Sequence, residues 1–176
     1  MRSVDEWMRS EETGTAFSHC VSCRVPLLEI DMPWLVTKEY SQGECVLEYA
    51  VCQPCRDRLS EEISEESKSA VRGFLENGID WDARIAEFML DPDPAARFSH
   101  CIACRTLRED TDGYAVSALF DSSGNLVTGP LPLLLCRHCT DHVMTLLSEQ
   151  SRDLWRRFMA DCFAGPPDDR AFPGIF

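Results

Sequence analysis

The chain has 176 residues, of which 44% are hydrophobic. This is enough for one ordinary domain or two small ones, and it is too apolar for a disordered protein. The formal net charge is −13, and neither half is basic, because residues 1–80 carry −8 and residues 81–176 carry −5. Phosphate backbones are bound mainly through Lys and Arg, so this balance disfavours general nucleic-acid binding.

The first half is expected to contain a short helix, a β-hairpin and a long helix. The expected elements are a helix at residues 4–8, a strand at 34–40, a turn at 41–44 and a returning strand at 45–51. After Cys55, apolar residues recur mostly every third or fourth position. This spacing predicts one long helix, which Asn77-Gly78 ends as a C-cap signal.

The second half is expected to repeat this order. The expected elements are a short helix at residues 80–90, a strand at 114–120, a turn at 121–125, a strand at 126–135 and a helix after Cys139. Gly129, Pro130 and Pro132 interrupt the second strand, which is therefore expected to lie at an edge or to bend. The proline-rich tail carries Phe172, Ile175 and Phe176, and part of it is expected to dock on the body or on a partner.

The two halves also match in sequence. The segment FSHCVSCR at 17–24 returns as FSHCIACR at 98–105, which is 81 positions later. From the second cysteine pair onward the offset is 84. Matches at this offset include Ser64 with Ser148, Ser67 with Ser151, Arg72 with Arg156 and Phe74 with Phe158. We therefore predict a duplication: residues 1–80 form repeat 1, residues 81–163 form repeat 2, and residues 164–176 form a C-terminal tail.

The expected compartment is the cytoplasm. The N-terminal residues are charged and lack the apolar core of a secretory signal. No apolar run reaches the roughly 18–20 residues of a membrane span, so no membrane association is expected. In a reducing cytosol, paired cysteines bind metal more often than they form disulfides.

Each repeat contains two Cys-x-x-Cys pairs, as a tetrahedral metal site requires. The two pairs are separated by residues 24–51 in the first repeat and by residues 105–135 in the second. A hairpin of this length can bring the second pair back to the first. The predicted metal ligands are Cys20, Cys23, Cys52 and Cys55 in repeat 1, and Cys101, Cys104, Cys136 and Cys139 in repeat 2. Four thiolates close the shell of a metal ion, whereas a catalytic zinc keeps an open position, so we expect two structural Zn²⁺ sites per chain. Disulfides and free thiols are the alternatives.

A Cys-x-x-Cys turn, a hairpin and a second pair leading into a helix form an order that resembles the treble-clef zinc fingers. The resemblance implies that Cys20/Cys23 and Cys101/Cys104 lie on zinc knuckles. It also implies that Cys52/Cys55 and Cys136/Cys139 lie at helix starts, where the amides stabilise thiolates. The predicted fold is therefore α+β, with two tandem repeats that each hold a knuckle, a small antiparallel hairpin and a long helix, packed as a pseudo-twofold unit.

Two other kinds of cysteine site have similar ligand sets. Zinc ribbons usually continue as a strand after the second pair, which fits the predicted helices badly. A rubredoxin-type iron site has the same number of ligands and is the minor alternative to zinc. The glycines expected after its pairs are replaced by Arg24, Arg56, Arg105 and Thr140.

Four histidines and two further cysteines are the remaining candidates for metal or thiol chemistry. His19 and His100 precede the first cysteines and are expected to hydrogen-bond near the sites or to pack. His138 and His142 lie at the start of a helix, as histidines do in treble-clef nucleases, but no acidic-histidine motif accompanies them. Cys45 and Cys162 fall outside the two clusters. Cys45 is interpreted as a small buried residue on a strand, Cys162 ends the last helix, and nothing near either predicts the low thiol pKa of a redox site.

From the closed sites, the acidic surface and the missing catalytic motif, we expect a non-enzymatic zinc-binding protein that acts as a protein–protein interaction or regulatory module. The acidic surface favours a basic partner protein, and the sequence makes no prediction of the oligomeric state. The alternative is a nucleic-acid-binding zinc finger, which needs a patch built from Arg24, Arg56, Arg58, Arg105, Arg108 and Arg137. The second alternative is a metal-dependent or thiol-redox enzyme.

Overall fold

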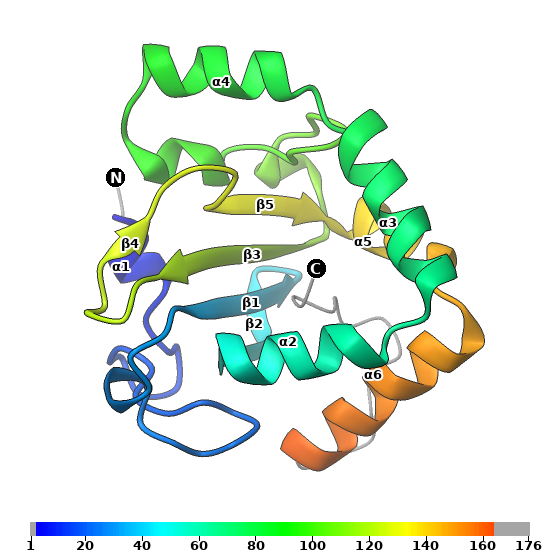
Figure 1. The fold of residues 1–176 in the computed structure, drawn as a ribbon. Helices are drawn as coiled ribbons and strands as arrows, with labels where there is room; N and C mark the ends of the chain where they lie inside the picture. Colours follow the sequence, from blue (N-terminus) through cyan, green and yellow to red (C-terminus); the bar gives the residue numbers. More distant parts are fainter. Residues whose placement is uncertain (1–2, 164–176) are drawn as a thin grey trace.

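The computed structural model describes residues 3–163 as an α+β fold around one five-stranded antiparallel sheet (Figure 1). The strands are β1 (Trp34–Ser41), β2 (Glu44–Cys52), β3 (Gly113–Phe120), β4 (Leu126–Val127) and β5 (Leu133–Cys136). The helices are α1 (Val4–Trp7), α2 (Gln53–Glu62), α3 (Glu65–Asn77), α4 (Trp81–Leu90), α5 (Arg137–Leu146) and α6 (Glu149–Cys162). The tail at 164–176, with its expected docking residues, lies outside the described part. Within residues 3–163, no helix combines the length and apolarity that a membrane crossing needs.

The two halves of the chain contribute to the same sheet. The strands β1 and β3 pair at its centre, with Trp34 opposite Phe120 and Thr37 opposite Ser117. β2 flanks β1, and both β4 and β5 pair with β3. The segment 126–135, expected to be one strand at an edge or bent, is divided into β4 and β5, and both pair with β3. The hairpins of the two halves therefore lie side by side in one sheet.

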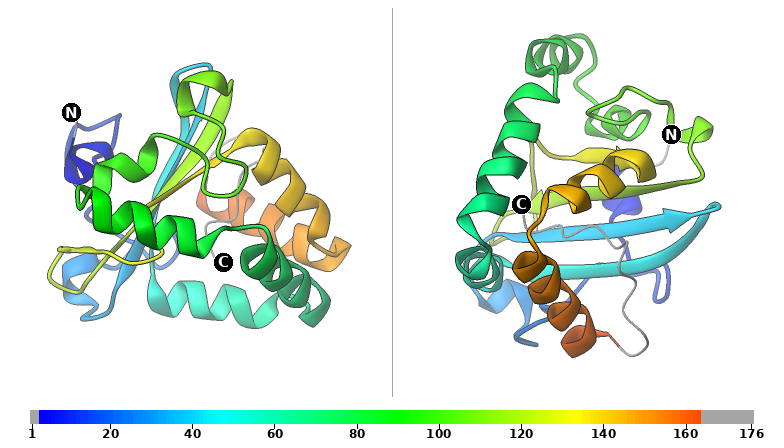
Figure 2. Two further views of the ribbon diagram at one scale, coloured as in Figure 1. Left: turned by 90° about the horizontal axis from the view of Figure 1, so that it is seen from above. Right: turned by 90° about the vertical axis from the view of Figure 1, so that its right-hand side faces the viewer.

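Both faces of the central strands are covered. The helices α2, α3, α5 and α6 gather on one face, and α1 lies on the other (Figure 2). On the α1 face, the Trp7 ring packs against Tyr40, with centroids 6.0 Å apart, and against Phe98 at 5.6 Å. The first seven residues of β1 are consequently all buried.

Lys38 lies in the buried part of β1, and its side chain is fully buried. Its Nζ donates to the carbonyl oxygens of Trp7 at 3.2 Å and Arg9 at 2.6 Å, and to Glu11 Oε1 at 2.8 Å. Glu48 Oε2 of β2 lies 3.5 Å away. Since a buried charge needs such partners, Lys38 ties the N-terminal segment to the sheet.

The expectation of one long helix after each second cysteine pair is wrong. Two helices follow in each half, broken before α3 and before α6. Ser64 accepts a hydrogen bond from the Ser67 amide, and Ser148 accepts one from the Ser151 amide, so each serine caps a new helix. The preceding residues Ile63 and Leu147 are buried. A serine cap after a buried residue therefore redirects the chain, although the apolar spacing continues across the break.

The helices pack across the two halves. α3 contacts α5, and α2 contacts α6. The Phe158 ring of α6 lies 6.1 Å from Tyr49 of β2, and Phe74 of α3 lies 5.8 Å from His142 of α5. The domain division at residues 80 and 81 stays a prediction, and the contacts described here cross it.

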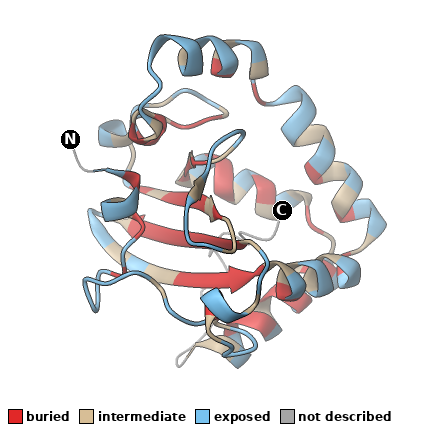
Figure 3. Cartoon of the chain, turned by 60° about the vertical axis from the view of Figure 1, so that its left-hand side comes forward, coloured by how far each residue is buried: buried red, intermediate tan, exposed pale blue. Residues whose placement is uncertain are grey.

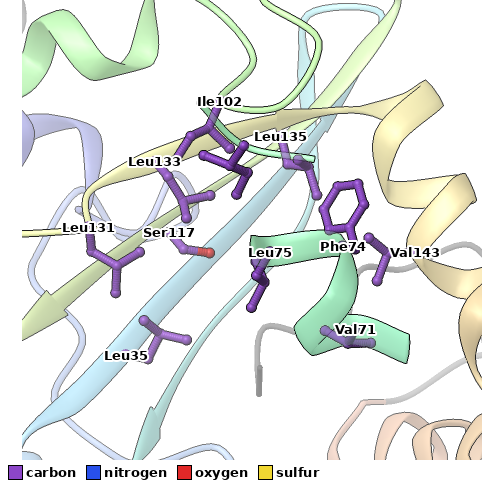
Figure 4. Close-up of a pocket in the computed structure, with 11 residues that line it drawn as sticks. Leu35, Val71, Phe74, Leu75, Ile102, Ser117, Leu131, Leu133, Leu135 and Val143 are labelled. Atoms are coloured by element: carbon purple, nitrogen blue, oxygen red, sulfur yellow. The ribbon is translucent and has the colours of Figure 1, made fainter. Parts of the chain in front are cut away.

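An apolar cavity of about 70 Å³ lies between α3 and the sheet (Figure 4). The residues that line it include Leu35, Val71, Phe74, Leu133 and Leu135. Under α6, by contrast, aromatic rings from both halves pack together: Tyr49, Trp155, Phe158 and Phe163 stack or meet edge to face. The core is therefore less completely filled under α3 than under α6.

Candidate metal centres

The first cysteine pair of each half lies on a tight turn. The Cys20 amide donates to the Val25 carbonyl at 3.0 Å, and the Arg24 amide donates to the Cys20 carbonyl at 3.0 Å. The second half has the same pair of bonds, from Cys101 to Thr106 at 2.8 Å and from Arg105 to Cys101 at 3.1 Å. Two turn amides per site thus hold the first pair in a knuckle.

The residue that follows each first pair has a left-handed backbone. Arg24 has φ 63° and Arg105 has φ 66°. For a residue with a side chain, this conformation costs roughly 1–2 kcal/mol, and glycine adopts it most easily. Arg24 and Arg105 therefore adopt, after the first pair of each site, a backbone conformation that glycine would adopt at lower cost.

The second cysteine pair of each half lies where a strand runs into a helix. Cys52 ends β2 and is the N-cap of α2, and Cys55 lies in the first turn of that helix. Cys136 and Cys139 hold the same positions at the junction of β5 and α5. The helix-start placement implied by the treble-clef resemblance is thus present in the structure.

These junctions bring the four sulfurs of each half together. In both clusters, all four Sγ atoms lie within 4.8 Å of one another. Cys23 Sγ lies 3.8 Å from Cys52 Sγ, and Cys104 Sγ lies 3.5 Å from Cys136 Sγ. Four sulfurs at about 2.3 Å from a tetrahedral zinc ion are about 3.8 Å apart. Both clusters, with all eight predicted residues, could therefore hold a metal ion.

None of the described cysteines forms a disulfide. Three cysteines of each cluster are buried, and the second one, Cys23 or Cys104, is exposed. The disulfide alternative is therefore absent from this structure. Any ion in these positions would be largely shielded from solvent.

Hydrogen bonds to the sulfurs favour thiolates, the form that binds metal. The Cys52 amide lies 3.4 Å from Cys20 Sγ, and the Cys136 amide lies 3.4 Å from Cys101 Sγ. Burial raises the pKa of Cys20, but amide hydrogen bonds, led by that of Cys52, outweigh it and lower the pKa to about 7. The Cys139 thiol is the main group that lowers the pKa of Cys101, to about 4. Each cluster thus has one sulfur that ionises readily.

Two polar side chains reach the clusters from outside. Arg58 Nη2 donates to Cys55 Sγ at 3.0 Å, and Thr106 Oγ1 lies 3.1 Å from Cys104 Sγ. A guanidinium beside a thiolate offsets part of the negative charge that four sulfurs would place on one ion. Arg58 has no cationic match at the same offset in the second half, where His142 takes its place.

The histidines join neither cluster. His19 and His100 bond to the hydroxyl groups of the serines that precede them, at 2.8 and 2.9 Å. His138 is exposed and His142 packs on Phe74. Among residues 3–163, the two cysteine clusters are the only groups of three or more candidate ligands. The described part therefore does not form the histidine site that the nuclease comparison would need.

The remaining cysteines are protonated at neutral pH. Burial is the main cause that raises the pKa of Cys45 to about 11, and it does the same for Cys162. Thiol chemistry depends on the thiolate, so neither residue is activated by its surroundings.

The arginines proposed for a nucleic-acid patch are drawn into contacts within the fold. Arg24 donates to the Cys162 carbonyl oxygen, and Arg58 donates to the Cys55 sulfur. Arg105 forms an ion pair with Glu87, and Arg108 lies over the Trp7 ring and donates to the Phe98 carbonyl oxygen. Arg56 is largely buried, and Arg137 lies against Gly113. Their positions near the cysteine pairs are as predicted. Their side chains, however, serve several different local contacts.

Comparisons with protein-family models, with curated proteins and with solved structures gave no match for this chain. The chemistry of the two clusters and of the surfaces around them is therefore the basis for a functional conclusion.

Sequence reasoning did not identify two groups of residues that the fold brings together. One is the set of four serines at the caps of α3 and α6, whose matching positions were visible but whose mutual contact was not. The other is the pair of buried arginines Arg84 and Arg97. A buried arginine has no local sequence signal, because burial of a long charged side chain is decided by distant segments.

Proposed function

We propose that this protein is a non-enzymatic zinc-binding protein that acts as a protein-interaction or regulatory module. The observation that carries the proposal is the pair of closed four-cysteine clusters, each at the junction of a knuckle, the sheet and a helix. Four thiolates occupy all the positions of a tetrahedral zinc ion and leave none for water or substrate, so both ions would be structural. Zinc is preferred to iron because zinc has no redox chemistry, as suits a structural ion, and because it commonly binds four cysteine thiolates.

The proposed architecture is a duplicated treble-clef-like unit with pseudo-twofold packing. Reciprocal contacts between the two halves support it. Thr37 Oγ1 lies 3.2 Å from Ser117 Oγ, at paired positions of the central strands. The Ser64 amide donates to Ser151 Oγ at 3.1 Å, and the Ser148 amide donates to Ser67 Oγ at 2.8 Å. Such reciprocal bonds are expected when two similar halves meet about an axis.

The charge of the chain supports a basic protein as the partner. The polypeptide carries −13, and four thiolates around Zn²⁺ would add about −2 at each site. Complementary charge speeds the encounter of partners more than it tightens the complex. Each arginine near the clusters has a contact within the fold, but Arg24, Arg58 and Arg105 are exposed, so the negative net charge is the main reason to favour a protein partner over nucleic acid.

The metal part of the proposal is tested by elemental analysis and native mass spectrometry of purified protein. Two zinc ions per chain are expected. A coloured protein with visible absorbance and iron content would replace zinc by iron, and fewer than two ions would contradict the assignment of two sites.

The interaction part is tested with zinc-loaded protein as bait, followed by titration of each captured protein in purified form. The expected partner is basic, binds with a Kd of about 1 μM or tighter, and binds more weakly as salt rises. A fluorescent DNA duplex and a single strand form the comparison arm. Salt-sensitive binding to either, without a protein partner, would favour the nucleic-acid alternative.

A further inference from the structure

Two arginines are buried side by side where α4 meets the turn at Pro94–Phe98. Arg84 of α4 and Arg97 of that turn are each only 4% exposed. Burial, and then the neighbouring charge of Arg97, lower the pKa of Arg84 to about 10. Like charges that share a buried site are unfavourable unless an anion compensates them.

The fold satisfies these guanidinium groups only in part. Arg84 Nη2 donates to the Pro132 carbonyl, and Arg97 Nη1 donates to the carbonyls of Asp91 at 3.2 Å and Asp93 at 2.9 Å. Arg84 Nε, Arg84 Nη1 and Arg97 Nη2 are buried without any hydrogen-bond partner. Buried donors are rarely left unpaired, so three on two adjacent cations indicate a missing acceptor.

No carboxylate within residues 3–163 supplies that acceptor. Neither guanidinium forms an ion pair with a described acidic side chain. Glu87 is the acidic group that acts on Arg84 through its charge, but its carboxylate is bonded to Arg105 and faces His100. The positive charge of the pair is thus left without a direct counterion from the described chain.

Both arginines line an open pocket of about 380 Å³. The walls come from Trp81, Ile85 and Phe88 of α4 and from the segment 128–130 that joins β4 to β5. The Phe88 ring stacks on Arg97, with the guanidinium carbon 4.6 Å from the ring centroid. A few convergent polar groups within apolar walls are typical of small-molecule sites, which occupy roughly 300–1,000 Å³.

The other half of the chain does not need this arrangement. At an offset of 81, Ser3 and Ala16 stand where the second half has Arg84 and Arg97. The apolar residues matching α4 are covered in the first half, where Val4 is 3% exposed, whereas its counterpart Ile85 is 61% exposed. Figure 3 shows most of α4 exposed at the rim of the molecule. The arginine pair is therefore an addition to the repeated scaffold and leaves an apolar helix face open beside it.

We propose that this pocket binds a small organic acid, with its carboxylate on Arg84 and Arg97 and its aliphatic or aryl group against Trp81, Ile85 and Phe88. A planar carboxylate suits two guanidinium groups because its two oxygens can each accept from an N–H donor. The unpaired donors of Arg84 and Arg97 are buried behind the apolar wall, so both side chains must turn toward the pocket to meet the carboxylate. A phosphate would bring further oxygens and more charge into a pocket that offers almost no other polar group, so an apolar carboxylate is the better match.

The experiment is an NMR titration of full-length, zinc-loaded protein with hexanoate, hexanamide and inorganic phosphate as probes. The reporters are the Nε–H signals of Arg84 and Arg97 and the indole N–H of Trp81, which donates to the Leu75 carbonyl at 2.8 Å. Hexanoate is expected to shift all three signals saturably and to bind at least about tenfold more tightly than either other probe.

Variants locate the binding. Arg84→Met keeps the length and apolar stem of the side chain while removing the charge, and it is expected to weaken hexanoate binding at least about tenfold. Arg156→Gln, a half-exposed arginine that pairs with Asp153 on α6 and lies outside the pocket, is the matched control and should bind as the parent does. The probe comparison needs only the parent protein, so it decides the question even if a variant fails to fold.

Several results would overturn the proposal. They are an absence of saturable shifts up to about 10 mM hexanoate, hexanamide or phosphate binding as tightly as hexanoate, or unchanged binding by a folded Arg84→Met protein. The zinc content of the sample is measured in parallel, so that failure of this site is distinguished from failure of the metal assignment.

Discussion

The hydroxyl oxygens of Ser64 and Ser148 lie 2.8 Å apart, although 84 positions separate the two residues in the chain. Each serine is also the N-cap of its helix, α3 or α6. One pair of side chains therefore begins two helices and joins the two halves of the molecule. This contact lies where the expected long helices are broken.

Replacing Ser148 by Ala should destabilise the protein by about 1–2 kcal/mol, because the change removes a helix cap and the contacts to Ser64 and Ser67. Equilibrium urea unfolding measures the effect. Ser69→Ala, at an exposed site within α3, is the control and should change stability by less than about 0.5 kcal/mol. Equal effects of the two substitutions would show that the serine contact contributes nothing.

Removing one metal ligand should abolish metal binding at one site and lower the stability of both halves. Cys20→Ser is expected to leave one zinc ion per chain by native mass spectrometry. It should also lower the thermal midpoint of the whole protein, because one sheet runs through both halves. Cys45→Ser, outside the clusters, should keep two ions. Retention of both ions by Cys20→Ser would contradict the ligand assignment.

Filling the cavity under α3 should stabilise the protein. Leu133 lines this cavity, whereas Tyr49, 84 positions earlier in the chain, packs its ring against Phe158 of α6. Leu133→Phe is expected to add about 0.5–2 kcal/mol to the free energy of unfolding by occupying empty volume. Leu133→Ala should instead cost about 2 kcal/mol or more. Destabilisation by both changes would mean that the cavity walls cannot accept a larger ring.

Glu48 should make the protein sensitive to acid. Burial raises its pKa, but hydrogen bonds from Ser10 and from the amides of Glu11 and Glu12, together with the charge of Lys38, outweigh burial and lower the pKa below its ordinary 4.5. The folded state therefore binds this proton more weakly than the unfolded state. The resulting stability is fully present above pH 4.5 and is lost as the pH falls through the folded pKa.

The test of this linkage is the pH dependence of unfolding for Glu48→Gln. At pH 7 the variant should be less stable by about 2 kcal/mol, because the buried Lys38 loses one of its charged partners. The difference from the parent should shrink below about pH 4.5. Glu44→Gln, an exposed site on the same strand, is the control. A difference that stays constant with pH would indicate lost packing rather than lost charge.

The cysteine clusters could be predicted because ligand placement is local. The knuckle turn at Cys20/Cys23 and the helix start at Cys52/Cys55 each involve only a few neighbouring residues. The hairpin between them pairs two consecutive strands through a short turn. The helix break at Ser64 was missed for the opposite reason. The apolar spacing continues through it, while the serine acts partly through Ser148, far away in the sequence.

By itself, the sequence determined the α+β composition, the two four-cysteine groups, the interrupted strand at 126–135 and the acidic charge. These depend on residue spacing and composition. Only the tertiary structure decided that β1 and β3 join the halves in one sheet, that Lys38 is buried, and that Arg84 and Arg97 share a pocket. These features arise from contacts between distant segments, because the burial of a charge and the pairing of two strands depend on which surfaces meet.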